Sequence, residues 1–297
     1  MDLRGIFGPV VTPFVSDGAL DLAGFRANVR AHIAAGLSGV VVTGSTGEGA
    51  LVDDAERRLL LEAARAELPA GKLLIAGTGA ESTRKVIERN ADAARIGADA
   101  VLVVAPHYYT TAMTHAALRA HYLAVAEASW VPVLLYNIPK YTHFPLPPAL
   151  IAELSAHPRI LGMKDSSGDL TLIAEYLRSQ HDDFTVLTGS GQTLAEAMAL
   201  GARGGILGVS LFAPELSLAT FAAARRGARD EAASLQARLA PVAREIVGTM
   251  GVPGVKAALD QVGLVGGAPR LPLLPAPAAD VTRIATLLAE IGAGVAA

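Results

Sequence analysis

Short apolar runs alternate with longer amphipathic stretches over most of the chain. The apolar runs are expected to form strands at residues 6–11, 39–43, 73–76, 100–104, 133–136, 160–164, 185–188 and 205–209. The stretches between them carry apolar positions at helical spacing, at residues 21–35, 53–67, 82–96, 115–128, 148–156, 169–178 and 193–200. Strands that alternate with helices are typical of a parallel α/β fold.

Eight expected strands, each followed by a helix, predict a (β/α)₈ TIM barrel over residues 1–212. A doubly wound sheet is the alternative, but it would need a glycine-rich dinucleotide turn after the first strand, and residues 8–13 do not form one. Residues 213–297 are expected to form a helical extension packed on the barrel. Its helices are predicted at 214–225, 229–247, 254–262 and 279–291, between glycine and proline breaks.

Composition narrows the classes of partner. The chain has 297 residues, of which 52% are hydrophobic, so it has the material for a substantial core. A net charge of -3 gives no electrostatic reason to bind nucleic acid or a membrane surface, and we expect neither partner. Cysteine is absent, which excludes disulfides and thiolate metal sites. The first residues lack the features of a secretory signal, so we expect a cytoplasmic protein.

A lone lysine, Lys164, ends the apolar run 160–163 and precedes the polar stretch 165–169. An amine in an apolar pocket loses hydration of its charged form, and a neutral amine can attack a carbonyl carbon to form a Schiff base. The alternatives are an ion pair with Asp165 or a side chain that extends from the strand end into solvent. The residues alone leave these possibilities open.

Polar residues gather at the carboxyl ends of the expected strands, where a barrel holds its active site. These positions are 44–48, 106–109, 136–139, 164–165 and 189–191. The turn with Ser45 and Thr46 offers amide groups and hydroxyls that could hold a carboxylate or phosphate, or it could simply cap the next helix. Tyr136 could be a core aromatic residue or could exchange protons with an imine on the neighbouring strand.

Taken together, the segments at 44–48, 106–109, 136–139 and 162–169 resemble the dihydrodipicolinate synthase and N-acetylneuraminate lyase family. The resemblance covers nearly the whole chain. It implies a (β/α)₈ barrel, usually a homotetramer, that acts as a class I aldolase. Such an enzyme forms a Schiff base with pyruvate or a pyruvyl group and uses neither a cofactor nor a metal ion.

The resemblance also assigns roles to residues. Lys164 would form the imine, and Tyr136 would be the acid–base group beside it. Ser45 would relay protons between Tyr136 and Tyr108, the latter donated by a neighbouring subunit of a homodimer or homotetramer. Thr46 and the amides of its turn would hold the pyruvyl carboxylate.

The far side of the pocket is expected at Gly189 and the backbone around Ile206. The family's dihydrodipicolinate synthases carry an arginine for the aldehyde's carboxylate two residues after their Tyr-Asn-Val-Pro motif. Here Lys140 is followed by Tyr141 at that position, where we expect Tyr141 to contact substrate. A tyrosine cannot replace a bidentate guanidinium, although Lys140 could substitute imperfectly.

The missing arginine puts lysine synthesis in doubt, and the Pro-X-Tyr-Tyr form of residues 106–109 and the segments 81–83, 157–158 and 251–256 look most like 4-hydroxy-2-oxoglutarate aldolase. We therefore expect cleavage of a 4-hydroxy-2-oxo acid. The enzymatic alternatives are 4-hydroxy-tetrahydrodipicolinate (dihydrodipicolinate) synthase and a 2-keto-3-deoxy sugar-acid aldolase or dehydratase. The remaining alternative is a catalytically silent ligand-binding barrel. The histidines form no close metal-ligand set in the sequence and are expected to be surface or capping residues, apart from His107 near the pocket.

Overall fold

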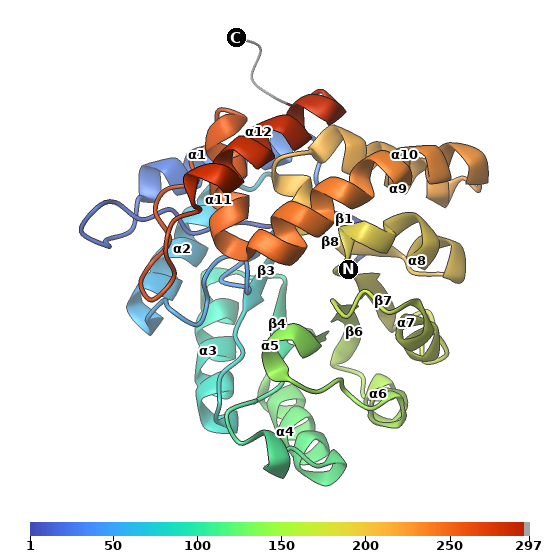
Figure 1. Ribbon diagram of the computed structural model, residues 1–297. Coiled ribbons are helices and arrows are strands. Elements are labelled where there is room, and N and C mark those ends of the chain that lie inside the picture. Colours follow the sequence, from blue (N-terminus) through green and yellow to red (C-terminus); the bar gives the residue numbers. More distant parts are fainter. Residues whose placement is uncertain (294–297) are drawn as a thin grey trace.

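Eight parallel strands close into a barrel in the computed structural model, which describes residues 1–293 (Figure 1). The first strand pairs with both the second and the eighth, so the sheet has no free edge. The predicted (β/α)₈ fold is confirmed. The strands are β1 (Gly5–Pro9), β2 (Gly39–Val42), β3 (Leu73–Gly77), β4 (Ala100–Val104), β5 (Val133–Asn137), β6 (Ile160–Asp165), β7 (Thr185–Thr188) and β8 (Gly204–Ile206).

Helices surround the barrel, and several begin at side-chain caps. Asp53 accepts a hydrogen bond from the backbone N–H of Glu56 in a capping box, and the Ser82 side chain accepts one from the Lys85 N–H at the start of the next helix. The helices are α1 (Leu22–Ala34), α2 (Asp54–Glu67), α3 (Thr83–Ile96), α4 (His115–Ala128), α5 (Pro139–Thr142), α6 (Pro148–Ser155), α7 (Leu170–Leu177), α8 (Leu194–Leu200), α9 (Pro214–Arg225), α10 (Arg229–Val242), α11 (Gly251–Gln261) and α12 (Ala278–Ile291).

Alternation along each strand separates two buried layers. One set of side chains fills the barrel interior and includes Phe7, Val41, Ile75, Leu102 and Ile206. The residues between them point outward and pack under the helices, because successive side chains of a strand face opposite sides. The interior side chains fill the barrel, so they form the bottom of any cavity at the carboxyl ends of the strands.

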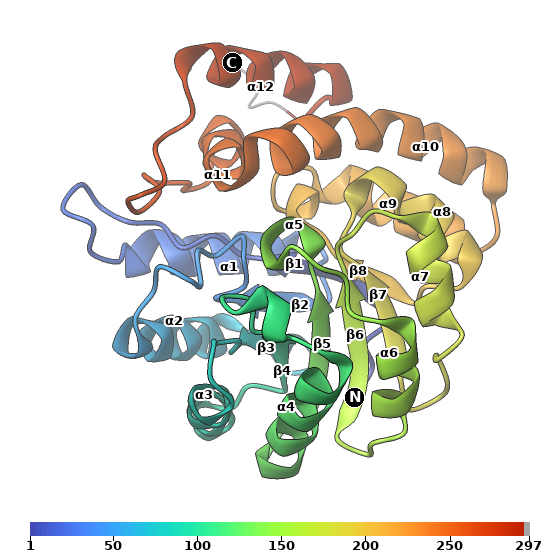
Figure 2. The same ribbon diagram turned by 60° about the horizontal axis from the view of Figure 1, so that its bottom comes forward.

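The helices α10, α11 and α12 form a layer over one end of the barrel (Figure 2). The preceding helix, α9, packs beside α8 and β1. The division of the chain into a barrel at 1–212 and an extension at 213–297 stays a prediction. None of the helices within residues 1–293 has the length and apolar character needed to span a lipid bilayer.

Several expected boundaries were shifted, and two of the shifts lie near the site. The eighth strand ends at Ile206, because residues Gly208–Leu211 turn into a short 3₁₀ helix. The helix expected over 229–247 ends at Val242 and continues as a π-helix over Ala243–Met250, after Pro241 has removed a backbone donor from its last turn. This π-helix contributes to the wall of the site described below.

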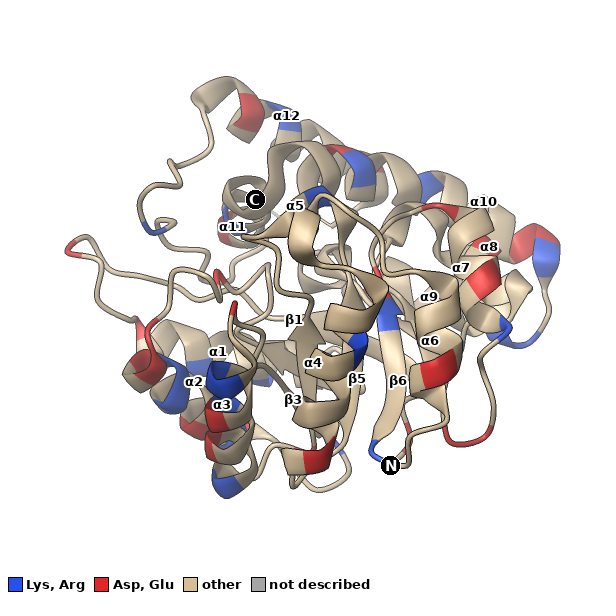
Figure 3. Ribbon diagram, turned by 90° about the horizontal axis from the view of Figure 1, so that it is seen from below, with Lys and Arg blue, Asp and Glu red and all other residues tan. Residues whose placement is uncertain are grey.

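Acidic and basic residues are interspersed on outer helices such as α2 and α3 (Figure 3). They form ion pairs between neighbouring helices, for example between Arg89 and Asp54, whose atoms lie 2.8 Å apart. Arg89 and Asp54 are half-buried, and exposed pairs such as Arg84 with Glu88 contribute little to stability. The charged residue of most interest for catalysis, Lys164, lies inside the barrel.

Candidate active site

Three side chains meet at the carboxyl end of the barrel. The Lys164 Nζ and the Ser45 Oγ each lie 3.4 Å from the hydroxyl oxygen of Tyr136. Strand pairing produces this meeting, because Tyr136 on β5 is the direct partner of Lys164 on β6, and both point into the barrel. The Lys164 amine also lies 4.5 Å from the centre of the Tyr136 ring. The structure thus brings together three of the four expected catalytic residues.

Lys164 is buried, with 6% of its surface exposed, and it has no acidic partner among the described residues. The neighbouring Asp165 points elsewhere, since its carboxylate accepts hydrogen bonds of 2.7 Å from the Asn137 amide and the Ser167 hydroxyl. Burial raises the pKa of Asp165. The geometry therefore supports neither an ion pair with Asp165 nor a side chain that extends into solvent.

Gly189 follows β7 and leaves room for the lysine. A Cβ at this position would lie 2.8 Å from the Lys164 Cε and 1.9 Å from the Ser166 Oγ, closer than atoms in proteins approach. Its backbone N–H donates to the Asp165 carbonyl at 2.5 Å. Any larger residue would displace the Lys164 side chain, so Gly189 is a requirement of the site's shape.

The turn after β2 carries Ser45 and Thr46. The amides of Glu48 and Gly49 close it through bonds to the Ser45 and Gly44 carbonyls, at 3.2 and 3.1 Å. Within residues 1–293 the Ser45 and Thr46 amides donate to no protein acceptor. Such amides suit a carboxylate. The alternative that this turn caps α2 is wrong, because Asp53 is the cap.

Glu48 closes the same turn from below. It has a positive φ of 53° and is buried, with its Oε1 2.5 Å from the Lys256 Nζ of α11. Its Oε2 accepts the Arg270 backbone N–H at 2.8 Å. Both cations also lie over the Phe14 ring. We call Glu48, Lys256 and Arg270 the clasp. Glu48 belongs to this turn and not to α2, which begins at Asp54.

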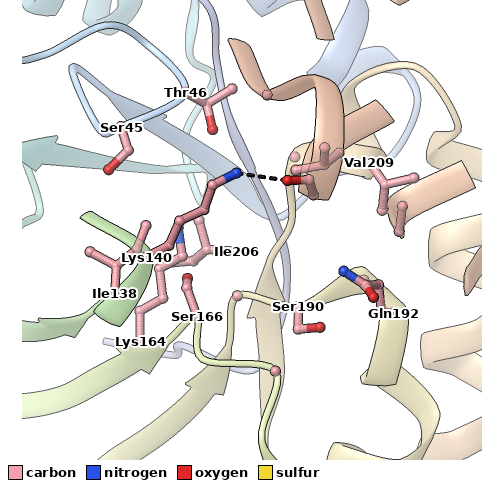
Figure 4. A pocket seen from close by; sticks show the side chains of 18 of the residues that line it. Ser45, Thr46, Ile138, Lys140, Lys164, Ser166, Ser190, Gln192, Ile206 and Val209 are labelled. Atoms are coloured by element: carbon pink, nitrogen blue, oxygen red, sulfur yellow. Dashed lines mark hydrogen bonds between the residues drawn. The ribbon is translucent and has the colours of Figure 1, made fainter. Parts of the chain in front are cut away.

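A cavity of about 260 Å³ opens above Lys164 (Figure 4). Its lining includes Gly189 and Ile206, and their expected contact with substrate stays a prediction. Sequence reasoning missed Gln192, which lines the cavity with Ser166 and Ser190. Its position shortly after β7 was the available signal, since loops after barrel strands carry sites.

At the mouth of this cavity lie Lys140 and Tyr141 of α5. The Lys140 ammonium donates to the carbonyl oxygen of Gly248, in the π-helix, at 2.7 Å. Tyr141 is 40% exposed, and burial of the rest of the residue raises the pKa of its hydroxyl. The expected contact of Tyr141 with substrate stays a prediction, supported by its place in the lining.

Tyr108 does not join the other site residues in this chain. It is 77% exposed and packs edge-on against Tyr109, with ring centres 5.0 Å apart. Its loop is held by Glu81, whose carboxylate accepts the backbone N–H groups of His107 and Tyr108 at 2.9 and 2.8 Å. A second cavity, of about 850 Å³, lies beside Ser45 and Tyr136 and is lined in part by His107.

Two histidines were wrongly expected at the surface. His32 in α1 is fully buried, and His121 in α4 is buried with its Nδ1 2.9 Å from the Thr83 hydroxyl. Burial lowers the pKa of each imidazole to about 4. Among residues 1–293, no group of three histidine or carboxylate side chains is placed to hold a metal ion.

Comparisons with known proteins agree with this geometry. The chain matches the family described as the dihydrodipicolinate synthetase family over residues 2–291. A 4-hydroxy-tetrahydrodipicolinate synthase of Xanthomonas axonopodis pv. citri is 41% identical over 280 residues, covering 94% of this chain and 91% of the relative.

Solved structures are similar over the same span. The chloride-inhibited dihydrodipicolinate synthase of Acinetobacter baumannii, complexed with pyruvate, has a TM-score of 0.93 and 31% identity, covering 98% of this chain and 100% of that one. A monomeric dihydrodipicolinate synthase variant has a TM-score of 0.92 and 28% identity, covering 98% and 97% of the two chains.

Proposed function

The chain belongs to the dihydrodipicolinate synthetase family of class I, lysine-dependent lyases, and from this premise we propose that Lys164 forms an imine with pyruvate. One observation carries the assignment. A single phenol hydroxyl, that of Tyr136, lies within 3.4 Å of both the buried Lys164 amine and the Ser45 hydroxyl. This arrangement pairs a nucleophile with a proton donor and a relay.

Imine formation uses these groups in sequence. The Lys164 nitrogen attacks the carbonyl carbon of pyruvate, and Tyr136 delivers the proton that lets the carbonyl oxygen leave as water. The pyruvate carboxylate is then held by the free amides of Ser45 and Thr46. Loss of a proton from the pyruvate methyl group converts the iminium into an enamine, which is the carbon nucleophile.

The enamine carbon then attacks the carbonyl carbon of an aldehyde acceptor, whose oxygen takes a proton. The product leaves when water, or an amine of the product itself, attacks the imine carbon and frees Lys164. The reverse sequence cleaves a 4-hydroxy-2-oxo acid. In this proposal Tyr136 moves protons in both directions.

We propose that the acceptor is aspartate semialdehyde, as in a 4-hydroxy-tetrahydrodipicolinate synthase. The support is the name of relatives such as the Xanthomonas protein, which is 41% identical to this chain. The expected likeness to 4-hydroxy-2-oxoglutarate aldolase is not confirmed by these comparisons. The comparisons thus favour the alternative over the main expectation.

A second candidate, cleavage of 4-hydroxy-2-oxoglutarate, is favoured by one residue. Tyr141 stands where the resemblance implies a carboxylate-binding arginine, and a phenol whose pKa is raised by burial carries no charge to replace it. A kinetic ranking of the two substrates separates the candidates. A higher kcat/KM for 4-hydroxy-2-oxoglutarate cleavage would make the second candidate the function.

The imine itself is tested by borohydride reduction in the presence of pyruvate, followed by peptide mass spectrometry. We expect an irreversible adduct on Lys164. Lys164→Arg should form no adduct and no product while keeping its fold, because a guanidinium stays charged and cannot form the imine. Labelling of a different lysine, or of none during turnover, would contradict the mechanism.

We further propose that the active site is completed between subunits by Tyr108. Its support is the exposure of Tyr108, 77%, together with the cavity of about 850 Å³ beside Ser45 and Tyr136, into which a second chain's aromatic side chain could reach. The alternative is a monomer that works without this tyrosine, and one relative is a monomeric variant.

Complementation tests the shared site. Tyr108→Phe and Lys164→Ala should each be nearly inactive, the first with kcat reduced about 10²- to 10⁴-fold. After dissociation and reassociation, hybrids pair an intact lysine with an intact tyrosine, so part of the activity should return. If native mass spectrometry shows hybrids but activity does not return, Tyr108 does not act across an interface.

A further inference from the structure

We propose that Lys140 binds a carboxylate on the acceptor and so selects anionic aldehydes. The inference rests on the proposed function, in which Lys164 carries pyruvate. It adds a residue that recognises the second substrate, the aldehyde acceptor.

The cavity above Lys164 is lined by cations without acids. Its charged side chains are Lys164 and Lys140, and no aspartate or glutamate of the described chain lines it. The remaining polar lining is uncharged, including Ser166, Ser190 and Gln192. Once Lys164 has become part of the pyruvyl adduct, Lys140 is the cation left to meet the incoming molecule. Such a cavity attracts anions.

Lys140 is placed between the two openings of the site. It stands in α5, directly after the strand that supplies Tyr136, and it lines both the 260 Å³ cavity and the 850 Å³ cavity. Figure 4 shows its side chain reaching across the cavity to the carbonyl on the opposite wall, with Lys164 on the strand below. An acceptor approaching Lys164 from solvent passes this ammonium.

The present partner of Lys140 is an uncharged carbonyl. Its ammonium donates to the Gly248 carbonyl at 2.7 Å and lies 5.6 Å from the centre of the Tyr141 ring. None of the carboxylates in residues 1–293 forms an ion pair with it. The Gly248 carbonyl is neutral, whereas a ligand carboxylate brings a charge opposite to that of the ammonium, so it binds Lys140 more strongly and can replace the carbonyl. The contact with Gly248 keeps the ammonium over the cavity until then.

A lysine at this position also determines how wide a range of acceptors the site accepts. An ammonium is a point charge on a flexible stem, without the fixed fork by which arginine binds a carboxylate through two parallel bonds. We therefore infer selection for the charge of the acceptor, with tolerance of its length. Aspartate semialdehyde fits this class, and so do glyoxylate and succinic semialdehyde.

Matched acceptors test the inference. Succinic semialdehyde and butanal share a four-carbon aldehyde chain and differ in a terminal carboxylate, and glyoxylate and acetaldehyde form a two-carbon pair. With pyruvate as donor, we expect the wild type to prefer the carboxylated member of each pair by about tenfold or more in kcat/KM. Added salt should reduce that preference, because it screens an exposed charge.

Variants assign the preference to Lys140. Lys140→Gln keeps a donor but removes the charge, and it should lower kcat/KM for the carboxylated acceptors by about tenfold while leaving the uncharged ones nearly unchanged. Lys140→Arg should retain most of the preference. Lys72→Gln is the control, because that ammonium also donates to one backbone carbonyl, of Leu37 at 2.7 Å, but lies before β3 at the opposite end of the barrel.

Borohydride trapping with pyruvate, run on every variant, distinguishes a failure of the proposed function from a failure of the proposed role of Lys140. If the wild type traps no pyruvate on Lys164, the proposed function fails. If trapping is intact, the inference is overturned by either of two results. One is a wild type that condenses the uncharged acceptors as well as the carboxylated ones, or condenses none of them. The other is a Lys140→Gln variant that keeps the wild-type preference.

Discussion

Tyr136 and Tyr176 are both buried tyrosines, yet their hydroxyl groups have different surroundings. The Tyr136 hydroxyl lies 3.4 Å from Lys164 and Ser45, at the long end of hydrogen-bond distances. The Tyr176 hydroxyl donates a short bond of 2.7 Å to the Leu146 carbonyl. We therefore expect the Tyr136 hydroxyl to act in the reaction and the Tyr176 hydroxyl to stabilise the fold.

Removal of the two hydroxyls should therefore affect different properties, turnover for Tyr136 and stability for Tyr176. Tyr136→Phe should lower kcat about 10²- to 10⁴-fold and change the free energy of unfolding little. Tyr176→Phe should cost about 1–3 kcal/mol of stability, because it leaves a buried carbonyl without its donor, with turnover largely kept. Steady-state kinetics and urea unfolding of both variants check this. Equal losses of stability would contradict the assignment of roles.

Local sequence could place Lys164, Tyr136 and Ser45 at one end of the barrel, because each follows or ends an apolar run, whereas their expected roles came from the family resemblance. It could not predict the clasp. Glu48 and Arg270 lie 222 residues apart, and only the closed fold brings them together. A carboxylate after a turn usually favours a helix start, and here the tertiary partners outweighed that local preference. The buried histidines were missed for a related reason, since burial depends on the opposing helices.

At the scale of elements, the clasp joins the turn after β2 to α11 and to the loop that follows it. Lys256 and Glu48 are each almost fully buried, and burial lowers the pKa of Lys256. Removing one partner leaves the other as an unpaired buried charge. The turn that carries Ser45 and Thr46 therefore depends on a helix outside the strand-and-helix repeat.

A double-mutant cycle measures this dependence. Glu48→Gln and Lys256→Met should each destabilise the protein by about 3–5 kcal/mol. The first leaves the buried Lys256 ammonium without its anionic partner, and the second leaves the buried Glu48 carboxylate without its ammonium partner. The double variant should lose less than the sum of the two, because neither unpaired group remains. Chemical unfolding of the four proteins gives the coupling free energy. Additive losses would show that the pair does not act as a unit.

Boundaries of elements were harder to predict than their existence. The strands and outer helices follow hydrophobic spacing, which the sequence displays directly. The π-helix Ala243–Met250 depends instead on Pro241 and on packing against the mouth of the site. Its Gly248 carbonyl, the partner of Lys140, comes from a backbone geometry that no periodicity announces.

At the scale of the whole molecule, two neutral histidines tie stability to pH. The pKa values of His32 and His121 fall from 6.5 to about 4 because burial disfavours the charged ring. The unfolded chain thus binds protons more readily between pH 6.5 and 4. Stability from these groups is complete above pH 6.5 and is lost as the pH falls toward 4.

We expect the free energy of unfolding to drop over that interval by about 1.4 kcal/mol per pH unit for each histidine. His32→Leu removes one titrating group, whose Nε2 has no partner within the described residues, and it should flatten the profile. Unfolding measured in urea from pH 4 to 8 tests this. Parallel profiles for the variant and the wild type would contradict the role of His32.

The clasp also imposes an order in time. A ribosome completes all eight strands, Tyr136 and Lys164 before it adds Lys256 and Arg270. A chain released after Val242 would possess the lysine and its phenol, but Glu48 would have neither of its cations. We expect borohydride to reduce little pyruvate onto Lys164 in such a fragment. The turn with Ser45 and Thr46 would bind the pyruvyl carboxylate only after the last part of the chain has been synthesised and has packed on the barrel.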